Sequence, residues 1–389
     1  MPPKKQFETV AIRTQTPTSS EREHSTPLYM TSSYVFESAE QARALFASEI
    51  EGNVYSRYSN PTADEFIEKM CRLEGAEMGV ATASGMAAVF STFAALLNQG
   101  DHIIASRSLF GSSHQILSQI LPRWGITYTY ADTLNTSQWE DLVQPNTKML
   151  FLETPSNPGL DLVDLAWAGR FAKNHHLIFA VDNCFATPYL QKPIEFGADI
   201  VQHSATKFID GQGRAIGGVI VGKKEYLQDI YFFARHSGPA LSPFNAWLFS
   251  KSLETLPVRM ERHCDNAEAI ADFLGNQKKV NFVKYPFHKS HPQRELAKKQ
   301  MKRGGGIVCF EIDGGFEQAK NFIDKVQMLS RSANLGDTRT IVTHPASTTH
   351  AKLTDAERLA VGITPGLIRI AAGLEHIDDI IADIEQALR

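Results

Sequence analysis

A lysine flanked by small hydroxyl residues is the first feature of this sequence that suggests chemistry. Lys207 lies in "HSATKFIDGQGR", between Ser204 and Thr206 on one side and a glycine-rich run on the other, about five residues after the apolar stretch "ADIVQ". An ammonium there must reach solvent or have its pKa lowered from about 10.4 by desolvation, which makes the amine nucleophilic. Lys207 is therefore a candidate for Schiff-base formation. Taken alone, a lysine is more often a solvated surface charge.

The glycines after Lys207 fit neither of the two common nucleotide motifs. The Walker motif places its lysine after the second glycine, whereas Lys207 precedes Gly211 and Gly213. The dinucleotide pattern G-x-G-x-x-G also fails, because three residues separate Gly213 from Gly217. The lysine needs another explanation.

Three further segments place polar groups after apolar runs, where ligands bind in open α/β sheets. "MGVAT" leads into Ser84-Gly85-Met86, the expected start of a helix whose free amides suit a phosphate. "LIFAV" leads into Asp182, a carboxylate that requires a cation or a donor. "MLFLETPSNP" ends in a polar turn that could line the same cleft. Each segment alone also fits an ordinary helix start, loop cap or turn.

Pyridoxal phosphate accounts for these groups together. The cofactor needs an amine for its aldehyde, a carboxylate for its pyridine nitrogen, donors for its phosphate and a flat group against its ring. The candidates, in that order, are Lys207, Asp182, the helix start at Gly85 and Met86 with Ser204 and Thr206, and the aromatic residue of "SLFGSS". We therefore predict a pyridoxal phosphate site.

The elements that must position these residues are visible as short apolar runs alternating with helical segments between about 60 and 250. This pattern predicts an α/β domain with a largely parallel sheet. Its seven strands are expected at 78–82, 102–106, 126–130, 149–153, 177–182, 198–202 and 217–221. Later runs, "NFVKY", "GIVCFEID" and "LIRIAAG", predict a smaller α+β domain. The segment 375–389 has Ile and Leu at helical spacing, which predicts an amphipathic closing helix.

We divide the chain into an N-terminal arm (1–58), a large cofactor-binding domain (59–254) and a small C-terminal domain (255–389). The first residues are rich in Thr, Ser and Glu with weak periodicity, which predicts an extended arm that packs on another subunit.

Composition and charge favour small-molecule partners. A net charge of −4 without an arginine-rich tract argues against nucleic acid or an anionic membrane. We expect a cytoplasmic protein, because the sequence shows no signal peptide and no apolar run of the roughly 20 residues that cross a bilayer. The cysteines have no CxxC spacing, which indicates reduced thiols and no metal site. They are Cys71, Cys184, Cys264 and Cys309.

The motifs together resemble the cystathionine synthase and lyase family of fold-type I pyridoxal phosphate enzymes, from about Phe7 to the carboxyl terminus. The segments that carry the resemblance are "YSRYSNPT", "ASGMAA", "ETPSNP", "VDN", "HSATKFIDGQGR", "NLGDTRTIVTHPASTTH" and "LIRIAAGLE". The resemblance implies a fold-type I transferase, with a seven-stranded mostly parallel sheet, an extended N-terminal arm and a smaller α+β C-terminal domain.

The resemblance also implies roles for the residues around the cofactor. Lys207 would hold pyridoxal 5'-phosphate covalently as an aldimine and then move protons, while Asp182 would keep the pyridine nitrogen protonated. Phe110 would stack on the ring without offering a phenol, and Asn157 would lie near the ring hydroxyl. The implied phosphate ligands from the same subunit are Gly85, Met86, Ser204 and Thr206.

Further roles concern the substrate and a second subunit. Arg369 would grip the substrate carboxylate with its two-donor fork, beside Asn334. Tyr55 and Arg57 would reach the phosphate of a neighbouring subunit, and Tyr55 would share in proton transfer. The active unit would then be at least a dimer, and family members are usually homotetramers built as dimers of dimers.

Within the family, "SSYVFESAEQA", "SLFGSS", "DGQGR" and "GPALSPFNAWLFSKSLETL" most resemble the O-succinylhomoserine sulfhydrylases. Ser112 lies near the position where methionine lyases carry a cysteine, and Ala333 replaces a glutamate of the cystathionine-handling branches. The implied reaction is γ-replacement: O-succinyl-L-homoserine and sulfide give L-homocysteine and succinate, in methionine biosynthesis. The alternatives are an O-acetylhomoserine sulfhydrylase, a methionine or cystathionine γ-lyase, a cystathionine γ-synthase, and a cofactor-binding regulator without turnover.

Overall fold

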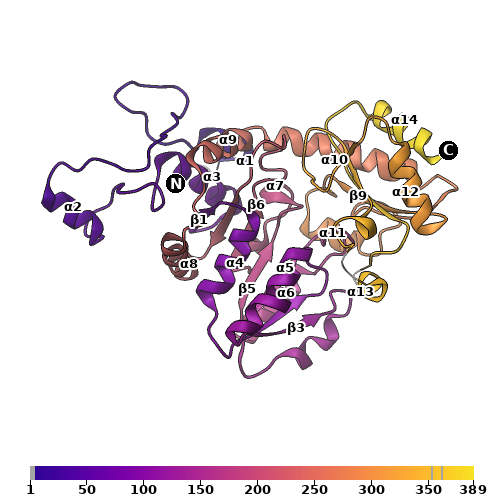
Figure 1. Cartoon of the computed structure of the whole chain (residues 1–389), viewed down its shortest axis with the longest axis horizontal. Helices are drawn as coiled ribbons and strands as arrows, with labels where there is room; N and C mark the ends of the chain where they lie inside the picture. The colour runs from indigo at the N-terminus through magenta and orange to yellow at the C-terminus, as the bar shows by residue number, and fades with distance from the viewer. Residues whose placement is uncertain (1–4, 352–353, 361) are drawn as a thin grey trace.

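The larger of two sheets has seven strands in the order β1-β7-β6-β5-β4-β2-β3. A computed structural model describes residues 5–351, 354–360 and 362–389 (Figure 1). The strands of this sheet are β1 (Met78–Thr82), β2 (His102–Ser106), β3 (Thr127–Ala131), β4 (Thr147–Glu153), β5 (Ile178–Asp182), β6 (Ile200–Ser204) and β7 (Gly218–Gly222). Strands β2 to β6 pair in parallel, and β7 runs antiparallel to β1 and β6. The predicted seven-stranded, mostly parallel sheet is confirmed.

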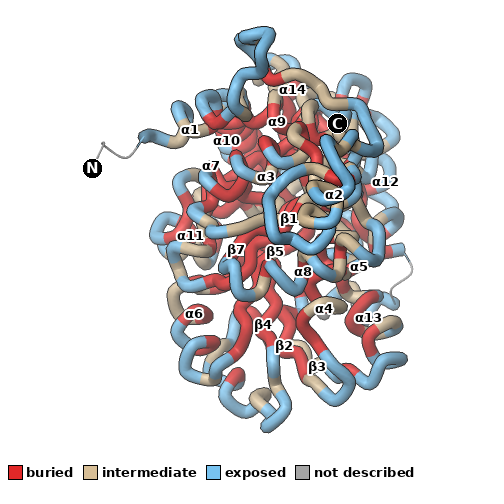
Figure 2. Tube along the Cα trace, turned by 90° about the vertical axis from the view of Figure 1, so that its left-hand side faces the viewer, coloured by how far each residue is buried: buried red, intermediate tan, exposed pale blue. Residues whose placement is uncertain are grey.

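Both faces of this sheet are covered, which explains why its strands appear in the sequence as continuous apolar runs. Side chains alternate along β4, so that Leu150 and Leu152 enter one core while Met149 and Phe151 enter the other. The first face is covered by α3 (Pro61–Glu74), α6 (Leu165–Asn174), α7 (Thr187–Leu190) and α9 (Pro243–Leu253). The second is covered by α4 (Gly85–Leu96) and α8 (Lys224–Ser237). In Figure 2 the buried strands run through the middle of the molecule.

The second sheet has five strands in the order β10-β11-β12-β9-β8. They are β8 (Val280–Lys284), β9 (Ile307–Ile312), β10 (Ser330–Arg331), β11 (Ile341–Thr343) and β12 (Leu367–Ala371). Strands β10 and β11 were not predicted, because elements of two or three residues show no periodicity. The predicted closing helix is α14 (Ile377–Leu388), and the other helices here are α10 (Leu256–Leu274), α11 (Arg294–Gln300), α12 (Gly315–Lys325) and α13 (Asp355–Ala360).

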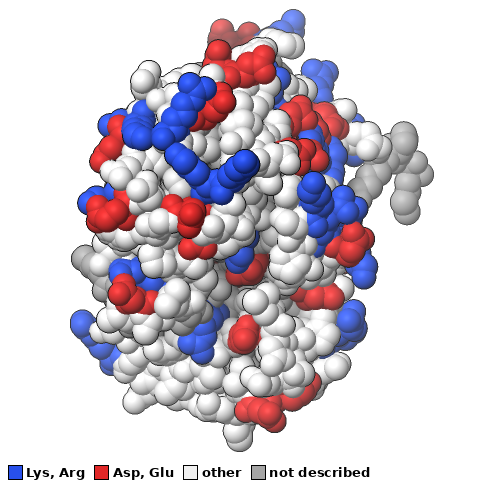
Figure 3. Space-filling view, turned by 90° about the vertical axis from the view of Figure 1, so that its right-hand side faces the viewer, with Lys and Arg blue, Asp and Glu red and all other residues white. Residues whose placement is uncertain are grey.

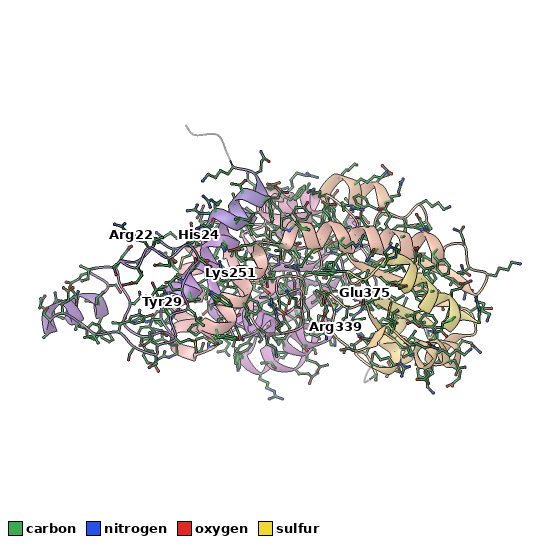
Figure 4. The ribbon with its side chains drawn as sticks, turned by 90° about the horizontal axis from the view of Figure 1, so that it is seen from above. Arg22, His24, Tyr29, Lys251, Arg339 and Glu375 are labelled. Atoms are coloured by element: carbon green, nitrogen blue, oxygen red, sulfur yellow. The ribbon has the colours of Figure 1, made fainter. Side chains whose placement is uncertain are left out.

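The segment 14–58 projects from the body of the molecule and carries α2 (Ala39–Phe46) (Figure 1). The weak periodicity of this region did not predict this helix or α1 (Phe7–Arg13). Helix α1 packs on the body: the ring of Phe7 meets that of Tyr189 edge-on at 5.2 Å, and Ala11 is fully buried. Seven residues give too short a pattern to stand out. Figure 4 shows three labelled arm residues in the same part of the molecule as Lys251 of α9: Arg22, His24 and Tyr29.

A buried ion pair ties the base of the arm to α3 and α9. The Lys69 ammonium lies 3.3 Å from Glu65, four residues earlier on α3, and their side chains are 0% and 1% exposed. Lys69 also donates to the backbone carbonyl of Ser250 on α9 (3.1 Å). The Glu65 carboxylate accepts hydrogen bonds from Thr16 N (2.9 Å), Thr26 Oγ1 and Ser250 Oγ (2.6 Å). One charged cluster therefore fixes two points of the arm.

We predict that Lys69→Met lowers the free energy of unfolding by about 3–5 kcal/mol, because it leaves the Glu65 carboxylate buried without its cation. Urea unfolding of the holoenzyme measures the change. The matched control is Arg72→Met, which removes an ion pair of the same spacing on the same helix, to Glu68, with side chains 59% and 52% exposed. The control should cost at most about 0.5 kcal/mol. Equal losses in the two variants would contradict this account.

Candidate active site

Each of three neighbouring parallel strands ends at a residue with a polar side chain. Glu153 ends β4, Asp182 ends β5 and Ser204 ends β6, and the register pairs Glu153 with Asp182. Carboxyl ends of parallel strands share one edge of a sheet, so these side chains meet there. Strand β6 ends two residues later than predicted, and Lys207 follows it in a turn where Lys207 N donates to Ser204 O (3.2 Å). The predicted amine and carboxylate are thus both placed at this edge.

The Lys207 amine is held by a segment from the smaller sheet. Its Nζ donates to Asn334 Oδ1 (2.7 Å). Burial lowers the pKa of Lys207, and the Arg369 guanidinium acts in the same direction. Gly336 has a φ of +75°, and a Cβ there would lie 2.5 Å from Phe208 N. Only glycine therefore allows this segment to pass so close to the lysine turn.

The two carboxylates of this edge are adjacent; Glu153 is buried and Asp182 is half-buried. Asp182 Oδ1 accepts from Cys184 N (3.0 Å), and burial raises the pKa of Asp182 to about 6. Burial and repulsion from Asp182 raise the pKa of Glu153 well above its usual value. Glu153 Oε2 accepts from Phe110 N (2.6 Å), so this carboxyl group fixes the backbone of the predicted stacking residue. From the sequence, Glu153 was predicted only to be part of a turn. Like Asp182, it is an acidic residue at the end of a buried strand, so the same signal could have identified it.

The first turn of α4 lies against the end of β6. The Ser84 hydroxyl caps the helix by accepting from Ala87 N (3.0 Å). A Cβ on Gly85 would lie 2.6 Å from the Cβ of Ser204, so the glycine allows the helix start to approach the Ser204 side chain. The helix amides and the Ser204 hydroxyl are thus brought together, as a phosphate cradle requires.

The other predicted cofactor ligands lie around this cradle. The Thr206 hydroxyl accepts from Gly217 N (3.1 Å), so the backbone already binds it. Ser113 Oγ of α5 (Gly111–Gln115) lies 4.0 Å from Met86 Sδ, which places the Phe110 segment beside the start of α4. Their contacts with phosphate stay predictions.

Arg369 of β12 forms the other wall of the site and is 3% exposed. Nη1 donates to Asn157 Oδ1 (2.9 Å), and Nη2 donates to the carbonyl oxygens of Ala333 and Asn334 (3.2 Å each). Within the described part of the chain Nε has no hydrogen-bond partner. A buried guanidinium with a free donor suits a carboxylate, and its link through Asn334 to Lys207 puts that carboxylate near the amine.

Tyr55 and Arg57 are placed elsewhere. The Arg57 guanidinium lies over the rings of Tyr58 (4.9 Å) and Tyr55 (5.3 Å), and it donates to the backbone carbonyl of Arg235 on α8. Within one chain these residues therefore join the arm to α8, and not to Lys207. Their role toward a neighbouring subunit stays a prediction.

The groups at this edge fit pyridoxal phosphate. A half-buried amine, a carboxylate one strand away and a helix start beside a hydroxyl match its aldehyde, ring nitrogen and phosphate. In the described ranges, 5–351, 354–360 and 362–389, we find no cluster of three His, Cys, Asp or Glu residues placed to hold a metal ion. On the face drawn in Figure 3, basic and acidic side chains are intermixed.

None of the helices in the part of the chain that the structure describes combines the length and apolar character needed to span a bilayer.

We predict that Glu153→Gln stabilises the protein relative to wild type increasingly as pH rises. The pKa of Glu153 is higher in the folded than in the unfolded protein, where it is about 4.3, so this group stabilises the fold fully when the pH is below the unfolded pKa. That contribution to stability is lost as the pH rises through the folded pKa. The neutral amide keeps an acceptor for Phe110 N and has no such loss. Thermal midpoints of the holoenzyme at pH 5 and pH 8 measure the trend, with Glu153→Ala as the control that loses the acceptor at both. A constant difference between Gln and wild type would contradict it.

Comparisons with known proteins agree with this site. Residues 8–389 match the family model of Cys/Met metabolism PLP-dependent enzymes. The chain is 47% identical to an O-succinylhomoserine sulfhydrylase of Pseudomonas aeruginosa, over 98% of this chain and 95% of the relative. A Mycobacterium tuberculosis protein of the same name is 46% identical over the same shares. An L-methionine gamma-lyase of Fusobacterium nucleatum is 43% identical over 93% and 92%.

Two solved structures share the fold. A Campylobacter jejuni chain assigned as an O-acetylhomoserine (thiol)-lyase has a TM-score of 0.95 and 34% identity over 98% of this chain and 99% of that one, and it carries N'-pyridoxyl-lysine-5'-monophosphate. A cystathionine gamma synthase of Xanthomonas oryzae has a TM-score of 0.94 and 32% identity over 99% and 98%. This chain therefore belongs to the pyridoxal phosphate-dependent enzymes of cysteine and methionine metabolism, and pyridoxal phosphate is its cofactor.

Proposed function

We propose that this enzyme converts O-succinyl-L-homoserine and sulfide to L-homocysteine and succinate, a step of methionine biosynthesis. The observation that carries the proposal is the 46–47% identity, over 98% of the chain, to two proteins named O-succinylhomoserine sulfhydrylase. Ala333 supports it, because a methyl group beside the site offers nothing to the distal amino group of a larger thiol such as cysteine. Sulfide needs no such partner.

Lys207 is the residue that holds the cofactor and moves the proton. When bound, pyridoxal phosphate supplies an electron-withdrawing ring that acidifies the carbons next to the substrate amine. Burial lowers the pKa of Lys207, which favours the neutral amine that can accept the α-proton and return it later. Asp182 binds the pyridine nitrogen and keeps its proton in place. Phe110 lacks a hydroxyl, so the remaining proton transfer falls to Lys207 and to Tyr55 of a neighbouring subunit.

The other residues bind and orient. Gly85, Met86, Ser204 and Thr206 hold the phosphate, together with Arg57 of a neighbouring subunit. Phe110 stacks on the ring, while Asn157 lies at the ring hydroxyl. Arg369 binds the substrate carboxylate, with Asn334 beside it, and so directs the γ-carbon toward the entering sulfide. The γ-acyloxy group leaves as succinate, and sulfur takes its place.

We further propose a cytoplasmic homotetramer, arranged as a dimer of dimers with shared sites. Its support is the projecting arm, which exposes large apolar side chains that a subunit contact would bury. Val35 is 99% exposed, Met30 65% and Phe46 56%. The distance of Tyr55 and Arg57 from the Lys207 network points the same way, and the unpaired cysteines suit a reducing compartment.

The test is a direct comparison of substrates. Homocysteine formation is measured with sulfide and the succinyl, acetyl or phosphoryl ester of homoserine, and ketoacid release is measured without a thiol. We expect kcat/KM for the succinyl ester to exceed that for the acetyl ester by about tenfold or more, since the site must bind a second carboxylate. Preference for the acetyl ester would support an O-acetylhomoserine sulfhydrylase instead. Faster ketoacid release without a thiol would support a γ-lyase.

A further inference from the structure

A row of polar side chains crosses one face of the larger sheet beneath the proposed cofactor site. The register pairs Glu153 of β4 with Asp182 of β5, and Asp182 with Gln202 of β6. All three lie on the face covered by α4, because side chains alternate along a strand and the residues two positions earlier, and in β4 and β5 also those four positions earlier, enter that core. Those earlier residues are Met149, Phe151, Ile178, Ala180 and Ile200.

Gln202 has no visible partner for its amide. Its side chain is 1% exposed, and neither Oε1 nor Nε2 makes a hydrogen bond within the described part of the chain. Leaving a buried polar group unpaired is destabilising, so such a side chain calls for an explanation. Its two register partners are Ile220 on β7 and Asp182 on β5. Ile220 is apolar, whereas Asp182 is a carboxylate that can accept from the amide.

Asp182 in turn needs a donor to stay ionised. It accepts one backbone hydrogen bond, at Oδ1 from Cys184 N. The carboxyl group of Glu153 on the adjacent strand disfavours a negative charge on Asp182, while His203 on β6 favours that charge. A neutral amide is suited to this place, because it stabilises an anion without adding a charge that would compete with the cofactor nitrogen.

We propose that Gln202 is a positioning residue of the cofactor site, whose Nε2 donates to the Asp182 carboxylate and keeps it ionised against the pyridine nitrogen. Adjacent strands lie about 4.8 Å apart, so Asp182 is within reach of a glutamine side chain on the next strand. Because the Gln202 amide makes no hydrogen bond to the residues that the structure describes, the proposed bond requires its side chain to rotate toward Asp182. The inference rests on the proposed function, since it takes Asp182 to be the partner of the cofactor ring.

The test replaces the amide by an apolar group of similar volume, in Gln202→Met. We expect the apparent dissociation constant for pyridoxal phosphate, measured by reconstitution, to rise about tenfold. The pH midpoint of the visible band of the bound cofactor should also rise. Without its donor, the Asp182 carboxylate becomes more basic and takes the proton from the pyridine nitrogen. The ring then loses its positive charge, and this loss makes the nitrogen that joins the cofactor to Lys207 more basic. Gln202→Glu, which adds a like charge, should shift both quantities further.

The matched control is Gln300→Met, the same change at a buried glutamine whose amide is fully bonded. Gln300 Nε2 donates to Gln191 Oε1 (3.1 Å), and Gln300 Oε1 accepts from Leu165 N (3.2 Å). This variant should lower the thermal midpoint and leave the visible band unchanged. In contrast, Gln202→Met should shift the midpoint of the visible band.

Asp182→Asn tests the proposed role of Asp182 separately from that of Gln202. If it shifts the band and Gln202→Met does not, the inference about Gln202 is overturned and the placement of Asp182 stands. If Asp182→Asn also leaves the band unchanged, the proposed role of Asp182 fails as well. In the Asp182→Asn background, Gln202→Met should add no further shift. An additional shift of the same size as in wild type would show that Gln202 acts without Asp182.

Discussion

The parallel pairing of β4, β5 and β6 is the constraint on which the rest of the site depends. It brings the ends of three strands to one edge and sets Glu153, Asp182 and the Lys207 turn side by side. Helices on both faces bury the strands that lead to this edge. Burial disfavours every charge there, which raises the pKa of the carboxyl groups and lowers that of the amine. One physical effect thus acts on both groups to which we assign chemistry, the Lys207 amine and the Asp182 carboxylate.

The smaller sheet completes the site by holding the lysine turn from the opposite side. Arg259 of α10 donates to the carbonyl oxygen of Phe208 (2.7 Å), and Asn334 binds the Lys207 amine. Arg369 donates to the backbone of the same segment, so the proposed substrate anchor and the reactive amine are fixed by one set of contacts. A change in how the two sheets pack would therefore alter substrate binding and proton transfer together.

The larger sheet could be predicted from the sequence, because strands buried on both faces appear as unbroken apolar runs. Lys207 and Asp182 were predicted from the sequence as well, since Asp182 follows such a run directly and Lys207 comes about five residues after another. The strands β10 and β11 and the helix α1 are too short to show a period. Glu153 was missed although it ends a buried strand as Asp182 does. The role proposed for Gln202 depends on which residues face each other across strands, and register cannot be derived from one sequence without the fold.

The most direct test of the account is to locate the cofactor on the chain. The holoenzyme is reduced with borohydride, digested, and its peptides are analysed by mass spectrometry. The account predicts that the added mass lies on the peptide containing Lys207, and that Lys207→Ala is colourless and forms no homocysteine. A label on another lysine, or wild-type homocysteine formation by Lys207→Ala, would contradict it.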